Sequence, residues 1–201
     1  QQYKKGKSLF YLCHLKAYLY IWFLKCISVQ RHYEREIFYQ YTQFLNSWFN
    51  LTKIKKISPT QAKALSELCK ETFVIPHGHS APKKEIEHYL KNNFSEERIQ
   101  QELKCSENEY YFIYHQNRIA GFSKIIFNSQ NDHIAKKNIT QLSRLYLLEE
   151  FYSLGLGKTL FDFNISLAKQ HHQAGVWLAV WVENKRAISF YKKLGFKKVG
   201  H

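Results

Sequence analysis

From residue 52 onward, hydrophobic and polar positions follow short periodic patterns that predict alternating strands and helices. Alternation with a period of two indicates strands, and apolar residues at every third or fourth position indicate helices. Ser58-Pro59-Thr60 begins a helix, because it supplies a cap and a first-turn proline. The elements expected in this part are a strand at 52–57, a helix from 58 to 73, a loop at 74–82, helices at 83–92 and 95–104, and strands at 109–115 and 118–127. A tight turn at Gln116-Asn117 joins the last two strands.

The last third of the chain repeats a strand–helix order. Strands are expected at 142–148 and 176–182, helices at 155–170 and 186–194, and a polar surface loop at 128–138. Residues 176–182 are almost continuously apolar, which is typical of a strand covered on both faces. The strand–helix–strand order predicts parallel neighbouring strands with a right-handed crossover.

Residues 1–52 form a separate region, which we expect to be an aromatic-rich helical extension without recognisable chemistry. Residues 8–28 are its most apolar window, but His14, Lys16 and Lys25 interrupt the apolar run. A lysine at the centre of a membrane span costs roughly 2.5–3.5 kcal/mol. We therefore favour a buried or interfacial helix over a membrane span.

Composition narrows the function classes. The 201-residue chain is 45% hydrophobic, which suits a packed domain of 53–201 plus the extension, and its formal net charge is +14. The basic excess favours anionic partners such as phosphorylated cofactors, whereas the absence of a sustained basic run argues against nucleic acid. The four cysteines match no zinc pattern and no secretion signal is evident, so we expect no metal and a cytoplasmic protein. Because the chain begins at Gln1 and contains no methionine, we expect it to be a processed or partial polypeptide.

A glycine-containing turn is the first candidate for chemistry. Gly155-Leu156-Gly157-Lys158 lies between an expected strand and an expected helix. Glycines let an anion approach backbone N–H groups at a helix start, where the helix dipole adds partial positive charge. The turn is neither a P-loop nor a dinucleotide fingerprint. Taken alone, it fits either a simple turn or a phosphate site.

Asn184 and Tyr191 are the second candidate. Asn184 follows the apolar run and precedes a helix, so it fits an N-cap. Tyr191 lies seven residues further on, hence on the same helix face. Its phenol fits either a core aromatic or a proton donor.

These segments together resemble the signature motifs of the GCN5-related N-acetyltransferases. The resemblance covers about residues 53–201, most tightly residues 142–147, the turn at 155–157, and 184–196. The segments 71–73, 89–90 and 111–121 are similar, more narrowly, to the Pai-type bacterial spermidine/spermine acetyltransferases. The family implies an α/β (α+β) fold with a mixed, splayed central sheet flanked by helices, which binds acetyl-CoA between two parted parallel strands.

The resemblance also implies roles for individual residues. Backbone groups on the first motif strand would pair with the pantetheine arm, the turn would hold the diphosphate, and Tyr191 would protonate the leaving thiolate. The cofactor-binding residues implied are Leu145, Tyr146, Leu147, Tyr152, Ser153, Leu154, Gly155, Leu156, Gly157, Lys158 and Asn184. The acceptor would be a primary amine, with a small polyamine favoured and a protein or peptide amine as the alternative.

This chain departs from the family pattern at several positions. The family usually has Gln or Arg where Tyr152 stands, and often Gly where Ser153 stands. Where many members have a glutamate general base, this chain has Gln141 and Ser143, which cannot accept a proton near neutral pH. A water chain, or a loop histidine, could replace that base.

The acceptor side and the sheet edge complete the expectations. We expect Glu71, His77 and His79 on the acceptor side. The family usually continues with further strands beyond the position of His201, so the C-terminal part of the sheet should be truncated here. The N-terminal extension, or a second subunit in a homodimer, would then cover that edge. The missing carboxylates leave open a catalytically weak, acetyl-CoA-binding regulatory protein.

Overall fold

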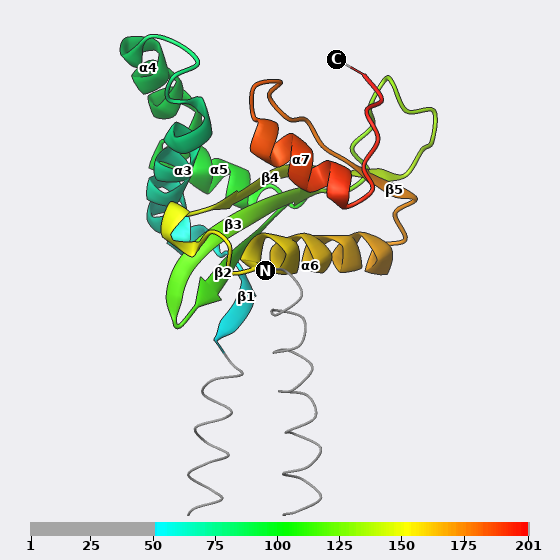
Figure 1. Ribbon diagram of the computed structural model, residues 1–201. Helices are drawn as coiled ribbons and strands as arrows, with labels where there is room; N and C mark the ends of the chain where they lie inside the picture. Colours follow the sequence, from blue (N-terminus) through cyan, green and yellow to red (C-terminus); the bar gives the residue numbers. More distant parts are fainter. Residues whose placement is uncertain (1–50, 201) are drawn as a thin grey trace, which may run out of the picture. The chain divides into compact units, whose positions relative to one another are not determined.

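The computed structural model describes residues 51–200, which form one five-stranded sheet with helices on both faces (Figure 1). Most of the expected extension, residues 1–50, lies outside the described residues. The strand order follows the chain, β1 (Thr52–Lys56), β2 (Asn108–His115), β3 (Arg118–Ile126), β4 (Ile139–Leu147) and β5 (Gly175–Trp177). The pairs β1–β2, β2–β3 and β3–β4 are antiparallel and β4–β5 is parallel, which confirms the predicted parallel neighbours and the mixed sheet.

The helices follow the predicted order. They are the short 3-10 turns η1 (Pro59–Gln61) and η2 (Glu149–Phe151) and the α-helices α3 (Ala62–His77), α4 (Lys83–Asn93), α5 (Glu96–Lys104), α6 (Leu156–Gln170) and α7 (Lys185–Lys193). Ser95 caps α5 by accepting a hydrogen bond from the Arg98 backbone N–H, as its sequence position predicts. Among the described residues, no helix combines the length and apolarity needed to cross a membrane.

Alternation along β2 divides the core between the two faces of the sheet. Tyr110 and Phe112 pack with α3 and α5 on one face, whereas Tyr111 and Ile113 pack toward α6 on the other. The β2–β3 turn has positive φ at Gln116 (50°) and Asn117 (62°), as a tight hairpin turn requires. The sheet is thus covered by α3 and α5 on one side and by α6 on the other (Figure 1).

Strand β4 contains the irregularity that shapes the site. Its register with β3 shifts between Lys124 and Ile125, which leaves Ser143 as an extra residue in β4. Such a bulge bends its strand. Pairing with β5 is confined to Ile139–Gln141, so the remainder of β4 pairs only with β3. The sheet is therefore splayed, as the family resemblance implies.

Two predicted boundaries are wrong. The expected strand at 176–182 is reduced to Gly175–Trp177, and none of residues 175–182 is buried, because β5 is an edge strand in the described sheet. The expected loop at 74–82 instead begins as the end of α3, which continues to His77. Pro76 lies inside the last turn of α3, and the helix ends one residue after it.

A buried ion cluster joins α5 to three strands beneath α3. Lys124 donates to a Glu102 carboxylate oxygen at 2.7 Å, and Arg144 lies 3.6 Å from the same oxygen. Tyr110 donates to Glu102 and accepts from Arg144 at 2.8 Å. Burial alone would raise the pKa of Glu102, but Arg144 and the hydrogen bonds from Lys124 and Tyr110 outweigh it and lower that pKa. The charges on this face of β4 are therefore paired with one another.

Candidate active site

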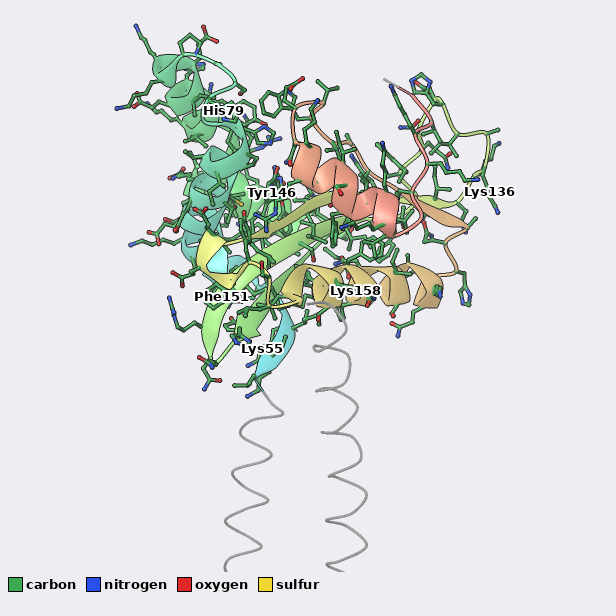
Figure 2. All side chains as sticks on the ribbon, in the orientation of Figure 1. Lys55, His79, Lys136, Tyr146, Phe151 and Lys158 are labelled. Carbon is green, nitrogen blue, oxygen red and sulfur yellow. The ribbon has the colours of Figure 1, made fainter. Side chains whose placement is uncertain are left out.

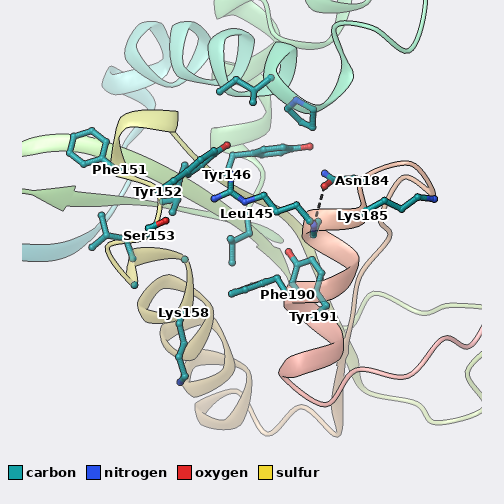
Figure 3. A pocket seen from close by; sticks show the side chains of 18 of the residues that line it. Leu145, Tyr146, Phe151, Tyr152, Ser153, Lys158, Asn184, Lys185, Phe190 and Tyr191 are labelled. Carbon is teal, nitrogen blue, oxygen red and sulfur yellow. Dashed lines mark hydrogen bonds between the residues drawn. The ribbon is translucent and has the colours of Figure 1, made fainter. Parts of the chain in front are cut away.

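A cavity of about 620 Å³ lies where β4 has parted from β5 (Figure 3). Its walls are the C-terminal half of β4, the turn that precedes α6, the first half of α7 and the end of α3. The predicted site residues that line it are Leu145, Tyr146, Leu147, Tyr152, Ser153, Gly155, Leu156, Gly157, Lys158, Asn184, Tyr191 and His79. Leu154, Glu71 and His77 are not among its lining residues.

The β4 wall presents an unpaired backbone edge to the cavity. Leu145 and Leu147 pair with Ser123 and Gly121 of β3 on one side, and no β5 residue pairs with them on the other. Gly121 lets β3 lie close against β4, because a Cβ at this position would lie 2.2 Å from the Tyr146 carbonyl oxygen. Free backbone N–H and C=O groups along an open strand edge suit a ligand that contains amides.

The turn before α6 leaves its first N–H groups free for an anion. Gly155 caps α6 in the left-handed conformation (φ 79°), with no atom within 4 Å of where a Cβ would lie. Ser153 is also left-handed (φ 65°), at the position where the family often has glycine. The Lys158 ammonium lies 2.5 Å from Asp162 and points away from the cavity (Figure 3), so the turn's positive potential comes from its backbone.

Asn184 and Tyr191 reach the cavity from α7. Asn184 caps that helix by accepting a hydrogen bond from the Ala187 backbone N–H at 3.0 Å, which confirms the expected N-cap. Burial, with a smaller effect of Tyr146, raises the pKa of Tyr191 well above its ordinary value. The Tyr191 phenol therefore keeps its proton at neutral pH and can donate it to a developing anion.

Arg186 crosses to the opposite wall. Its guanidinium lies 3.6 Å from the centre of the Tyr152 ring, a cation–π contact between the first turn of α7 and the turn before α6. Burial raises the pKa of Tyr152, and the charge of Arg186 partly offsets that rise. The charge of Arg186 therefore lies beside Tyr152, the position at which the GCN5-related N-acetyltransferases usually have Gln or Arg.

The expected acceptor-side residues lie in different places. His79 lines the cavity on the side opposite Lys158, with Tyr146 between them in Figure 2. His77 stacks on Phe73, with 4.5 Å between ring centres, and burial lowers its pKa. Glu71 is exposed on α3.

The two positions where a general base is common do not line the cavity. Gln141 belongs to the part of β4 that pairs with β5, and its side chain accepts a hydrogen bond from Ser129 at 3.5 Å. Ser143 occupies the bulge. The cavity therefore receives no carboxylate from β4.

Several cavity residues were not predicted from the sequence. They are Ile75, Pro76, Phe151, Glu183, Lys185, Arg186, Ala187 and Phe190. Helical spacing from Asn184 would have found Ala187, because it lies on the same face as Tyr191. The α3 residues could not be found in this way, since the end of α3 was expected to be a loop.

This arrangement defines a class of enzyme that transfers an acyl group from a nucleotide-linked carrier. An open strand edge faces the cavity, the glycine-containing turn before α6 lies at one end, and the Tyr191 phenol reaches in from α7. Comparison with known proteins gives the family. The model of the acetyltransferase (GNAT) family matches residues 64–196, so the chain belongs to this family and is an acetyl-CoA-dependent N-acetyltransferase.

Individual relatives agree with this assignment. An uncharacterised N-acetyltransferase of Lactobacillus delbrueckii subsp. lactis is 25% identical over 147 residues, covering 73% of this chain and 84% of that protein. The spermidine N(1)-acetyltransferase of Thermoplasma acidophilum is 26% identical over 147 residues, covering 72% and 88%. The crystal structure of a PaiA N-acetyltransferase from Thermoplasma acidophilum, solved with coenzyme A, has the same fold, with a TM-score of 0.63, 23% identity and coverage of 73% and 89%.

Proposed function

We propose that this chain transfers the acetyl group of acetyl-CoA to a primary amine in the cavity between β4 and α7. The observation that carries the proposal is the parting of β4 from β5 beyond Gln141, which leaves the Leu145–Leu147 edge facing a cavity of about 620 Å³. That edge would pair with the pantetheine amides, and the N–H groups from Gly155 onward would hold the diphosphate. Asn184 would contact the cofactor arm.

The chemical step needs one attack and one proton transfer. The neutral amine nitrogen attacks the thioester carbonyl carbon, the C–N bond forms and the C–S bond breaks. Tyr191 donates its proton to the leaving sulfur, and the proton lost by the amine passes through water, which also restores the phenol. The place of Tyr191 in the cavity lining, on the face of α7 that also carries Asn184, supports this role.

Two acceptor classes follow from the sequence and the relatives. A small polyamine is supported by the similarity to the Thermoplasma acidophilum spermidine N(1)-acetyltransferase. A protein or peptide amine is the alternative, and it is supported by the scarcity of carboxylates in the cavity, where Glu183 is the only acidic lining residue among those described.

The test is calorimetry with acetyl-CoA followed by thiol release across a panel of amines. Binding of acetyl-CoA together with thiol release that depends on the amine supports the proposed transfer. Binding without turnover on any amine would favour the catalytically weak, regulatory alternative. No detectable binding of acetyl-CoA would contradict the assignment of the cavity.

A further inference from the structure

A cluster of aromatic rings reaches the cavity at His79, which is the member that lines it. Phe73 stacks on His77 and also on Tyr89, whose ring centre lies 4.9 Å away. Trp181 lies 5.3 Å from His77 and 5.5 Å from His79. We name these five residues the aromatic mouth. It joins the end of α3 to the segment between β5 and α7.

Exposed apolar side chains gather around the aromatic mouth. Ile75 lines the cavity, Val74 precedes it on α3, and Val182 follows Trp181. These three side chains and Tyr89 account for four of the six exposed large apolar side chains of the described residues, with Leu154 and Val199 as the others. An apolar ligand that covers exposed apolar groups beside a cavity removes them from water, which makes its binding more favourable.

Negative charge is scarce on this side of the cavity. Glu183, the acidic lining residue, lies 3.5 Å from the Lys185 ammonium and is therefore already paired. Glu71 is exposed on α3 and does not line the cavity, and Glu87 lies 3.8 Å from Lys83. Holding a second ammonium group of an acceptor here would cost hydration that no unpaired carboxylate of the lining restores.

The imidazole of His77 suits an apolar partner. Burial, and then the charge of His79, lowers the pKa of His77, so that ring is neutral at neutral pH and stacks as an aromatic. Rings in edge and offset contact provide a flat apolar wall for another ring.

We propose that the acceptor is a primary amine attached to an apolar or aromatic body, and that the aromatic mouth binds that body beside the site of acetyl transfer. Two sources share this chemistry, a free arylalkylamine and the hydrophobic N-terminal residue of a peptide. The inference rests on the proposed function, because it names the acceptor of that same site.

The experiment compares thiol release for 2-phenylethylamine, for a phenylalanyl dipeptide amide and for spermidine. We expect kcat/KM for at least one of the two phenyl compounds to exceed that for spermidine by about tenfold or more. Burial of a phenyl ring is favourable enough to produce a ratio of that size. The better phenyl compound identifies the source. A preference for spermidine would overturn the proposal, since the rings would then serve as cation–π contacts for ammonium groups.

Two variants test whether the preference for phenyl compounds arises at the aromatic mouth. Val182→Asp should lower kcat/KM for the phenyl compound several-fold and raise it for spermidine. Val199→Asp is the matched control, because Val199 is similarly exposed (56% against 63%) and adjoins no residue of the aromatic mouth in the chain, whereas Val182 follows Trp181. Neither valine lines the cavity itself. Equal effects of the two substitutions would contradict the proposal.

A binding measurement separates failure of this inference from failure of the proposed transfer. If no amine releases thiol, binding of 2-phenylethylamine to the CoA-loaded protein is measured by ligand-observed NMR. Binding that Val182→Asp weakens and Val199→Asp preserves would support the mouth even without turnover. Absence of such binding would overturn it.

Discussion

Strand β4 borders two regions of opposite design, the ion cluster and the cavity. Arg144 points into the buried ion cluster, where its partners Glu102, Tyr110 and Lys124 also bond one another. The next residue, Leu145, lines the cavity, where the strand edge has no partner among the described residues. A closed network can hold a strand rigidly while the adjacent edge stays open for a ligand. The cluster therefore contributes stability, whereas the open edge contributes binding.

Breaking the cluster should have the largest effect on stability. Glu102→Ala leaves Lys124 and Arg144 without their anion, so we expect a loss of about 3–5 kcal/mol in the free energy of unfolding. Urea denaturation measures this loss. Glu87→Ala is the control, because its exposed pair with Lys83 should contribute at most about 1 kcal/mol. Similar losses in both variants would remove the distinction between a buried and a surface pair.

Removing the Tyr191 hydroxyl should lower activity while leaving the free energy of unfolding almost unchanged. We expect Tyr191→Phe to lower kcat by about 10²–10⁴-fold, because the leaving thiolate loses its proton donor. Acetyl-CoA binding by calorimetry should stay within a few-fold. Tyr114→Phe removes a hydroxyl from β2, outside the cavity lining, and should leave kcat unchanged. Full activity of Tyr191→Phe would exclude Tyr191 as the donor.

Gly121 couples the two regions, since it lets β3 approach β4 closely. A Cβ in Gly121→Ala would lie 2.2 Å from the Tyr146 carbonyl oxygen and 2.9 Å from the Leu147 Cα. We expect a destabilisation of about 1–3 kcal/mol and weaker acetyl-CoA binding, because the strands must move apart. Thermal unfolding measures the first effect and calorimetry the second. Gly175→Ala in β5 should be tolerated, since its nearest contact would be 3.8 Å.

Acid should weaken the cluster specifically. The pKa of Glu102 is lowered in the folded state, so its contribution to stability is present above the unfolded pKa of about 4.3 and is lost as pH falls through the lower folded value. We expect Glu102→Gln to lose less stability than the wild type when the pH falls below about 4.5. Parallel acid dependence of the two proteins, in urea denaturation at several pH values, would contradict this account.

The smallest expected effect concerns the contact across the cavity. Arg186→Ala removes the cation that stacks on Tyr152, and we expect the Kd for acetyl-CoA to rise about two- to fivefold. Lys55→Ala is the control, because the Lys55 ammonium lies 5.9 Å from the Tyr114 ring centre and neither residue lines the cavity. An unchanged Kd in the Arg186 variant would limit this residue to a structural role.

Local signals in the sequence were sufficient for much of the fold and part of the cavity. The hairpin at Gln116-Asn117, the cap at Asn184 and the glycine turn before α6 all depend on neighbouring residues, and each is present as predicted. Tyr191 was placed correctly on the face of α7 that lines the cavity, because helical spacing alone fixes that face.

The remaining features depend on contacts between distant segments. The bulge at Ser143 and the early end of β5 arise from pairing with other strands, which no local pattern encodes. The Glu102–Lys124–Arg144 cluster joins three elements, and the aromatic mouth forms because α3 continues past Pro76 toward Trp181. Sequence by itself determined most of the segments that line the cavity. Tertiary structure decided where the strands part and what surrounds the acceptor, because packing free energy outweighs local preference at those positions.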